Sequence, residues 1–291
     1  MRAKWTDLAV EAAGGELREG GLSRTVVKVE DEASARRLGR PMGTYVTLAC
    51  EQALTVSLET RRALAAELAK TLRGMLPEGM KTALVVGLGN RSVTPDSLGP
   101  RTAERVLVTR HMGDCLPRDV PMSSVCAAAP GVLGVTGMET AEILRGMVAH
   151  VKPDAVIAVD ALAARSSKRI ASTIQITDTG ITPGSGVGNH RKALDRRTLG
   201  VPVIAVGVPL VVYASTIASD ALCALGEGEV EEERIAACVE RVVSEKLGEM
   251  IVTPRDVDAL VERMAGVLAD GINQALHPSL SSSEIAQLMA Q

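Results

Sequence analysis

Aromatic residues are almost missing from this 291-residue sequence, which contains no Phe, one Trp and two Tyr. A core without aromatic rings must be built from Val, Leu, Ile, Ala and Met, and it offers no platform on which bases or sugars can stack. Basic residues are not in excess either, because 32 Lys and Arg stand against 35 Asp and Glu and no dense basic run occurs. Electrostatic binding of nucleic acid needs clustered positive charge. The composition therefore argues against a nucleic-acid-binding protein.

Cysteine pairs and long apolar runs are also missing. The five cysteines are widely spaced, with no Cys-x-x-Cys among them, which is typical of reduced thiols in the cytosol and not of a zinc site or a disulfide frame. The longest apolar run, Val201 to Ala214, is shorter than the roughly 18 residues of a membrane-spanning helix. The first residues lack the apolar core of a signal peptide. We therefore expect a cytoplasmic protein that does not enter a membrane.

What the chain does contain is an alternation of apolar runs with helical patterns. Short continuous apolar runs are typical of strands buried in a parallel sheet, and they occur at Ala83 to Val86, Ala155 to Val159 and Val203 to Val206. Helical patterns occur at Leu58 to Leu76, Ala103 to Thr109, Glu139 to Ala149 and Ser215 to Leu225, and again in the last quarter at Ile235 to Val243 and Val257 to Leu268. The alternation predicts an α/β fold with a mostly parallel central sheet and helices on both faces.

A small β-hairpin or sheet extension is expected before this core. Two β-type runs, Thr25 to Val29 and Thr44 to Leu48, are joined by a polar stretch, Arg36 to Gly43, that contains Gly and Pro. Such a pair is typical of a hairpin or of an antiparallel edge of a sheet.

The first candidate for chemistry is Asp96, in a segment that follows the strand ending near Gly87. A dinucleotide-binding loop is a poor match there, because Ser92 stands where the third glycine of the fingerprint is required. In Thr94-Pro95-Asp96, the carboxylate falls in the first turn of a helix, where the helix dipole favours it. That role explains an Asp by itself, but the carboxyl ends of strands are also where open α/β sheets keep their ligand crevices.

The second candidate is Asp160, which directly follows the apolar run Ala155 to Val159. We expect it at the carboxyl tip of an interior strand, where a desolvated carboxylate is costly unless it has partners or a function. Two carboxylates that meet in one crevice can share a proton or hold a water, since the proximity of like charges raises one pKa and creates an acid beside a base. The pair Asp96 and Asp160 therefore suggests a hydrolase.

A glycine-rich loop follows, from Asp178 to Lys192. Its backbone at Gly184 and Gly186 can approach a ligand closely, and its amides can serve as hydrogen-bond donors. His190 can act as a base or a metal ligand, although a histidine beside Arg191 and Lys192 is more often a solvated loop residue.

Five ordered blocks cover most of residues 80–220: GLGNRSVTPDSLGP (Gly87 to Pro100), APGVLGVTGMET (Ala129 to Thr140), KPDAVIAVDALAARS (Lys152 to Ser166), TDTGITPGSGVGNHR (Thr177 to Arg191) and GVPVIAVGVP (Gly200 to Pro209). Together these blocks resemble the germination protease family of endospore-forming bacteria. The resemblance implies a fold similar to that of the hydrogenase-maturation endopeptidases, a homotetramer, and cleavage, after acidic residues, of the small acid-soluble proteins that coat spore DNA.

The resemblance also assigns roles to residues. The two aspartates that the family uses in catalysis match Asp96 and Asp160. The stretch Thr6 to Ala12 resembles the region where the family's precursor cuts itself, which makes Asp7-Leu8 the expected bond. We therefore expect a leader in residues 1–15, a single protease domain in residues 16–291, and a location in the cytoplasm of the forespore or spore core.

The resulting hypothesis is an endopeptidase in which Asp96 and Asp160 activate a water, one as base and the other as acid. The loop at Gly184, Gly186 and His190 would supply donors to the oxyanion or contact the substrate. Two alternatives stay open, and no cofactor is assigned. In one, the aspartates and His190 bind a divalent metal, as in a maturation-type endopeptidase. In the other, the Gly87 and Gly184 loops bind an anion in a protein without catalytic activity.

Overall fold

The computed structural model describes residues 6–15, 21–50, 57–115, 122–183, 192–225 and 250–290. Within them the chain forms one eight-stranded sheet in the order β1-β2-β6-β7-β5-β3-β4, with β8 paired to β7. The strands are β1 (Leu22–Val29), β2 (Gly43–Cys50), β3 (Thr82–Gly87), β4 (Ser124–Ala128), β5 (Ala155–Ala164), β6 (Thr173–Thr177), β7 (Val203–Tyr213) and β8 (Ile251–Val252).

The centre of the sheet is parallel and one side of it is antiparallel. Strands β4, β3, β5 and β7 run parallel to one another, whereas β6, β2 and β1 continue the sheet by antiparallel pairing. The α/β prediction is confirmed, and β1 and β2 form the expected antiparallel extension. The polar stretch between them is not only a turn, because it begins inside a short helix, α2 (Glu32–Leu38), capped by the Asp31 side chain.

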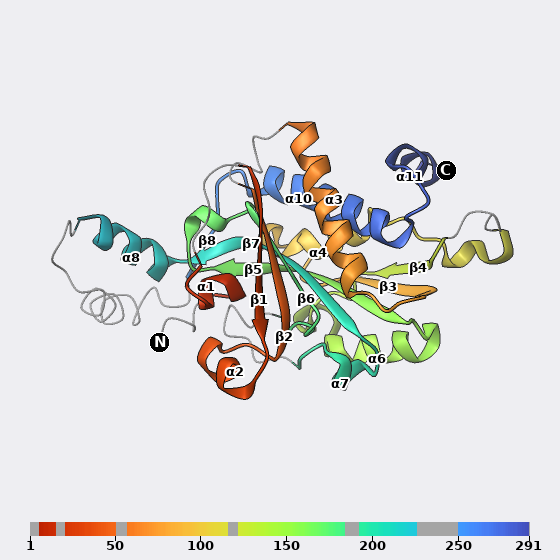
Figure 1. Cartoon of the computed structure of the whole chain (residues 1–291), viewed down its shortest axis with the longest axis horizontal. Helices are drawn as coiled ribbons and strands as arrows, with labels where there is room; N and C mark the ends of the chain where they lie inside the picture. Colours follow the sequence, from red (N-terminus) through yellow and green to blue (C-terminus); the bar gives the residue numbers. More distant parts are fainter. Residues whose placement is uncertain are drawn as a thin grey trace.

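Helices cover both faces of the sheet, as predicted. Figure 1 shows α3 and α10 on one face and α6 and α7 on the other. The helices are α1 (Ala9–Ala12), α2, α3 (Leu58–Met75), α4 (Leu98–Ala103), α5 (Leu133–Thr136), α6 (Thr140–Val151), α7 (Arg196–Leu199), α8 (Ala214–Leu225), α10 (Val257–Leu276) and α11 (Ser282–Met289), with 3-10 turns η2 (Thr94–Ser97), η3 (Arg110–Cys115) and η4 (Ser167–Arg169). No helix of the described part of the chain is long and apolar enough to cross a bilayer.

Two aliphatic cores fill the spaces between the layers. The larger core joins one face of the sheet to α3, α4 and α10, and the side chains of Ile157, Val159 and Val206 point into it. The smaller core lies on the opposite face, where Val156 and Ala158 contact residues of α6 such as Leu144. Because side chains alternate along a strand, this division fixes which face each residue of β5 and β7 presents.

The sequence prediction was wrong at one helix. The helix predicted over Ala103 to Thr109 is not formed, because α4 ends at Ala103 and the chain then extends beside β4. There the Thr109 amide donates to the Val125 carbonyl over 2.9 Å. Strand β4 itself was not predicted. The stripe expected at 235–243 lies outside the described residues.

Residues 6–15, here called the N-terminal segment, pack against the sheet. Leu8 and Val10 are 0% and 2% exposed and contact Leu162, Ala164 and Val212. Full burial of two such side chains stabilises the docked position by about 3–6 kcal/mol.

Candidate active site

Asp160 lies inside strand β5 (Ala155–Ala164). The sequence pattern predicted it at the carboxyl tip of the strand, and that prediction was wrong. The strand continues to Ala164 because β7 runs beside it as far as Val212, with a register shift after Leu162. The neighbour on the other side, β3, ends with Gly87 opposite Val159. Asp160 therefore stands one residue beyond the end of the shorter strand, 5% exposed, with its Oδ1 accepting the Ala161 amide over 2.9 Å.

Asp96 is held by the loop that follows β3. Its Oδ2 accepts the Asn90 amide over 2.6 Å, and its own amide donates to the Val93 carbonyl over 2.9 Å. Gly89 has a φ of +111°, and a Cβ there would lie 2.0 Å from the Asp96 carbonyl oxygen. A glycine is therefore required for the loop to fold back over Asp96. Pro95 lies in the first turn of η2, as expected, although Val93 and not Thr94 is the N-cap residue.

Close backbone contact brings the Asp96 segment to strand β5. A Cβ on Gly99 would lie 2.2 Å from the Leu88 carbonyl oxygen and 2.5 Å from the Val159 carbonyl oxygen. The Leu88 amide donates to that same Val159 carbonyl over 2.8 Å, and η2 contacts β5. Asp96 and Asp160 thus belong to segments that meet at the carboxyl end of β3.

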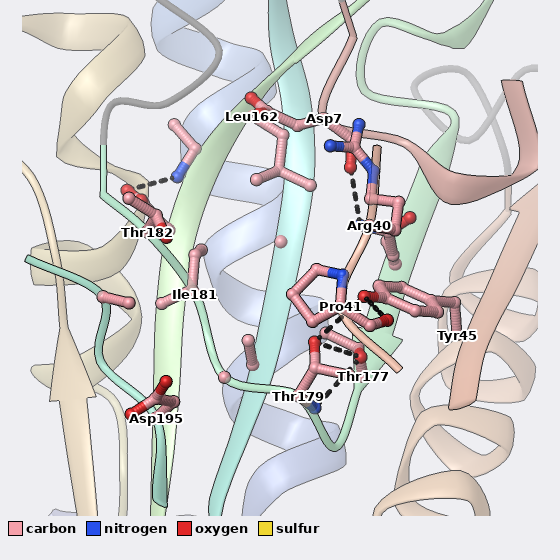
Figure 2. A pocket seen from close by; sticks show the side chains of 17 residues that line it. Asp7, Arg40, Pro41, Tyr45, Leu162, Thr177, Thr179, Ile181, Thr182 and Asp195 are labelled. Atoms are coloured by element: carbon pink, nitrogen blue, oxygen red, sulfur yellow. Dashed lines mark hydrogen bonds between the residues drawn. The ribbon is translucent and has the colours of Figure 1, made fainter. Parts of the chain in front are cut away.

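A cavity of about 160 Å³ opens on the face of the sheet that carries the Asp160 side chain, and Asp160 is one of the residues that line it. Residues of β2, β5, β6 and β7 line it together with Asp7 and Arg40, whereas Asp96 does not. Figure 2 shows Asp7 and Arg40 together at one side of the cavity and Asp195 at the opposite side. The glycine-rich loop borders the cavity at Thr182, and Ala193, the residue directly after the loop, borders it as well.

The N-terminal segment enters this cavity at Asp7. The Asp7 amide donates to the Ala163 carbonyl over 2.9 Å, and the Ala163 amide donates to Asp7 Oδ2, also over 2.9 Å. The Asp7 carbonyl accepts the Gln175 side-chain amide over 2.9 Å. The expected processing bond, between Asp7 and the buried Leu8, is therefore fixed on the same sheet face as Asp160.

Both tyrosines of the chain lie near this region, and burial raises the pKa of each phenol further above physiological pH. Burial and then the negative charge of Asp7 raise the pKa of Tyr213 to about 12. Burial also raises the pKa of Tyr45, whose hydroxyl donates to the Pro41 carbonyl over 2.8 Å. Of the two, Tyr45 lines the cavity, so it contributes a neutral hydroxyl to the cavity wall at physiological pH.

One group of residues from the sequence prediction is not among the described residues. Gly184, Gly186 and His190 lie outside the described residues. The described part of the chain contains no group of three or more His, Cys, Asp or Glu side chains that could hold a metal ion. Conversely, Arg40 lines the cavity, and no sequence pattern predicted this. Gln175 could be noticed as an amide between two isoleucines, although that alternation favours a solvent-exposed strand face and all five residues of β6 are buried.

Comparison with known proteins identifies the family. The family model described as germination protease matches residues 10–227 and 222–289. A germination protease of Clostridium acetobutylicum is 42% identical, covering 98% of this chain and 98% of its own. That of Caldanaerobacter subterraneus is 41% identical over 98% and 97% of the two chains. Among solved structures, the [NiFe] hydrogenase maturation protease HycI of Thermococcus kodakarensis matches with a TM-score of 0.35 and 19% identity, over 69% of this chain and 98% of its own.

The chain therefore belongs to the germination protease family. By this membership it is a peptidase of spore germination, and the resemblance seen in the motif blocks is confirmed.

Proposed function

We propose that this protein is the endopeptidase that degrades small acid-soluble spore proteins during germination, cutting after acidic residues. Asp96 and Asp160 would activate a water for attack on the scissile carbonyl, one accepting its proton and the other protonating the leaving amine. The observation that carries the proposal is the meeting of the η2 segment and strand β5 at the end of β3, with Asp160 buried and lining a cavity.

The proposal includes a self-processing precursor cut between Asp7 and Leu8. It is supported by the position of the Asp7 side chain and carbonyl, which are bound to Ala163 and Gln175 on the sheet face of Asp160. We further propose that the enzyme acts as a homotetramer in the cytoplasm of the forespore or spore core, which light scattering and fractionation of spores can test.

The decisive experiment measures cleavage of a purified small acid-soluble spore protein by the wild type, Asp160→Asn and Asp96→Asn. Each Asn variant keeps the size of the side chain but cannot exchange the proton, so we expect loss of turnover with an unchanged thermal unfolding midpoint. Asp154→Asn is the matched control, because Asp154 binds the Lys81 and Thr82 amides at the opposite end of β3. Wild-type turnover in Asp160→Asn would refute the mechanism.

The same cleavage assay also distinguishes two mechanisms. In one the two aspartates activate the water without a metal, and in the other they bind a divalent metal ion that activates it. Activity that survives exhaustive chelation eliminates the variant in which Asp96, Asp160 and His190 hold a divalent ion. Activity lost on chelation and restored by one added metal supports that variant.

A further inference from the structure

Three residues on adjacent strands form a row across the floor of the cavity. In the sheet register Gly207 of β7 pairs with Gln175 of β6 on one side and with Asp160 of β5 on the other. Paired residues present their side chains to the same face, which here is the face opposite the larger core. At about 4.8 Å between strands, the Cα atoms of Gln175 and Asp160 lie about 10 Å apart.

The centre of this row carries no side chain of its own, because it is a glycine. A Cβ on Gly207 would lie 2.6 Å from the Cδ1 and Cγ atoms of Leu162, so the Leu162 side chain covers this position. Gln175, Gly207 and Asp160 all line the cavity, with an amide on one side of the row and a carboxylate on the other.

Gln175 already holds a peptide backbone in this way. Its Nε2 donates to the Asp7 carbonyl over 2.9 Å, and its Oε1 accepts the Ala9 amide over 2.6 Å. The Gln175 side chain thus spans the Asp7-Leu8 bond. It donates to the carbonyl of Asp7, before the bond, and accepts from the amide of Ala9, two residues after Asp7. Gln175 is 7% exposed, so these two bonds form away from bulk water.

The contacts on either side of Gln175 are also contacts to the main chain. The Arg40 guanidinium donates to the Thr6 carbonyl, and the Ala163 carbonyl accepts the Asp7 amide. Such contacts can be made to any extended peptide with few demands on its side chains. The N-terminal segment therefore binds beside the cavity through its main chain, as a peptide ligand would, with Asp7 lining the cavity.

We propose that Gln175 is the residue that positions and polarises the peptide carbonyl to be cleaved, in the N-terminal segment and in a substrate from another molecule. This inference rests on the proposed function. A water adds its oxygen to the carbonyl carbon and gives up a proton to one aspartate, while the carbonyl oxygen becomes an oxyanion that the Gln175 Nε2–H group stabilises. The carbon–nitrogen bond then breaks, the amine takes a proton from the acid, and the products are a new carboxyl group and a new amino terminus.

The test is the first-order rate at which the full chain yields a product that begins at Leu8, followed by mass spectrometry. Gln175→Glu keeps the length of the side chain and an acceptor for Ala9, but its ionised form has no donor. Removal of one oxyanion donor typically slows catalysis by about 10²–10³-fold, and we expect a loss of this size near neutral pH. As the pH falls below about 4–5 the glutamic acid regains a proton to donate, so the deficit relative to wild type should shrink.

Two comparisons separate this role from a merely structural one. Thr173→Val is the control, because Thr173 lies on the same strand and the same face as Gln175 and is fully buried. Its hydroxyl has no hydrogen-bond partner among the described residues. The Thr173→Val chain should therefore cleave itself at the wild-type rate. In an Asp160→Asn background, which keeps the chain intact, Gln175→Leu should speed hydrogen exchange of peptides covering residues 6–15.

The outcomes distinguish the two proposals. A wild-type chain that never cuts itself after Asp7 overturns the proposed self-processing and the catalytic role of Gln175 with it. Self-cleavage in the wild type and at an equal rate in Gln175→Glu overturns the role of Gln175 alone. A deficit in Gln175→Glu that is the same at every pH, or unchanged exchange in Gln175→Leu, also overturns it.

Discussion

A buried ion pair anchors the N-terminal segment, and its removal should release the segment without unfolding the protein. The carboxylate of Glu11 and the guanidinium of Arg169 are 4% and 3% exposed, with Oε1 and Nε 3.4 Å apart. Glu11 also accepts the Arg165 amide over 2.8 Å and the Ser166 amide over 2.9 Å. Burial lowers the pKa of Arg169, while the charge of Glu11 opposes that shift.

Arg169→Met removes one partner and keeps much of the apolar volume. Breaking a buried ion pair costs about 3–5 kcal/mol when the other charge stays buried. Here the lower end applies, because two backbone amides still bind Glu11 and because the segment can detach and expose the carboxylate to water. A loss of about 3 kcal/mol raises the detached population by about a hundredfold.

The assay is hydrogen exchange of residues 6–15 in an Asp160→Asn background, compared with the thermal unfolding midpoint. We expect about a hundredfold faster exchange in the segment and little change in strands β3 and β5. Glu11→Leu combined with Arg169→Met should restore much of the protection, because no charge is then left buried. Exchange within threefold of wild type in Arg169→Met would refute the view that this ion pair holds the segment.

The remaining predictions concern the glycines and the pH dependence. Gly99→Ala should cost about 1–3 kcal/mol in denaturant unfolding and reduce cleavage, because its Cβ meets the backbone oxygens of Leu88 and Val159 and displaces Asp96. Gly207→Ala should reduce cleavage more than stability, because the nearest atoms to its methyl group belong to the flexible Leu162 side chain, which must shift within the row beside Asp160. Tyr213, with its pKa raised to about 12 from about 10 when unfolded, contributes stability that is complete below pH 10 and lost as the pH rises to 12. Tyr213→Phe should flatten this alkaline loss in unfolding experiments, and an unchanged loss contradicts the assignment.

The buried strands and the family motifs could be predicted from sequence because both are local. Ala155 to Val159 is apolar throughout because β5 is covered on both faces. This run predicts the strand without any knowledge of the strands it pairs with. Its end could not be predicted, because β5 continues past Asp160 only through pairing with β7. Strands β5 and β7 are far apart in the sequence, so no local sequence pattern can predict how far they pair.

The buried polar residues were harder to predict for a different reason. In β6 the alternation of Thr and Gln with Ile is typical of a strand with one face in water, yet Thr173, Gln175 and Thr177 are all buried. The face that the pattern assigns to solvent lines the cavity at Gln175 and Thr177 and contacts the N-terminal segment through Gln175. The polar residues of this strand face are therefore explained by contact with peptide backbone and not by exposure to water.

The position of the N-terminal segment links the two proposals. The Ala163 backbone and the Gln175 Nε2 group are each engaged by Asp7, so a second peptide cannot use these groups until Asp7 leaves. Cleavage at Asp7-Leu8 separates Asp7 from the anchored part of the segment, because Leu8, Val10 and Glu11 lie on the far side of that bond and keep their own contacts. Hydrolysis would therefore let Asp7 dissociate while the Glu11–Arg169 ion pair still holds residues 8–15, and a chain cut after Asp7 should act on other proteins whereas an uncut chain should not.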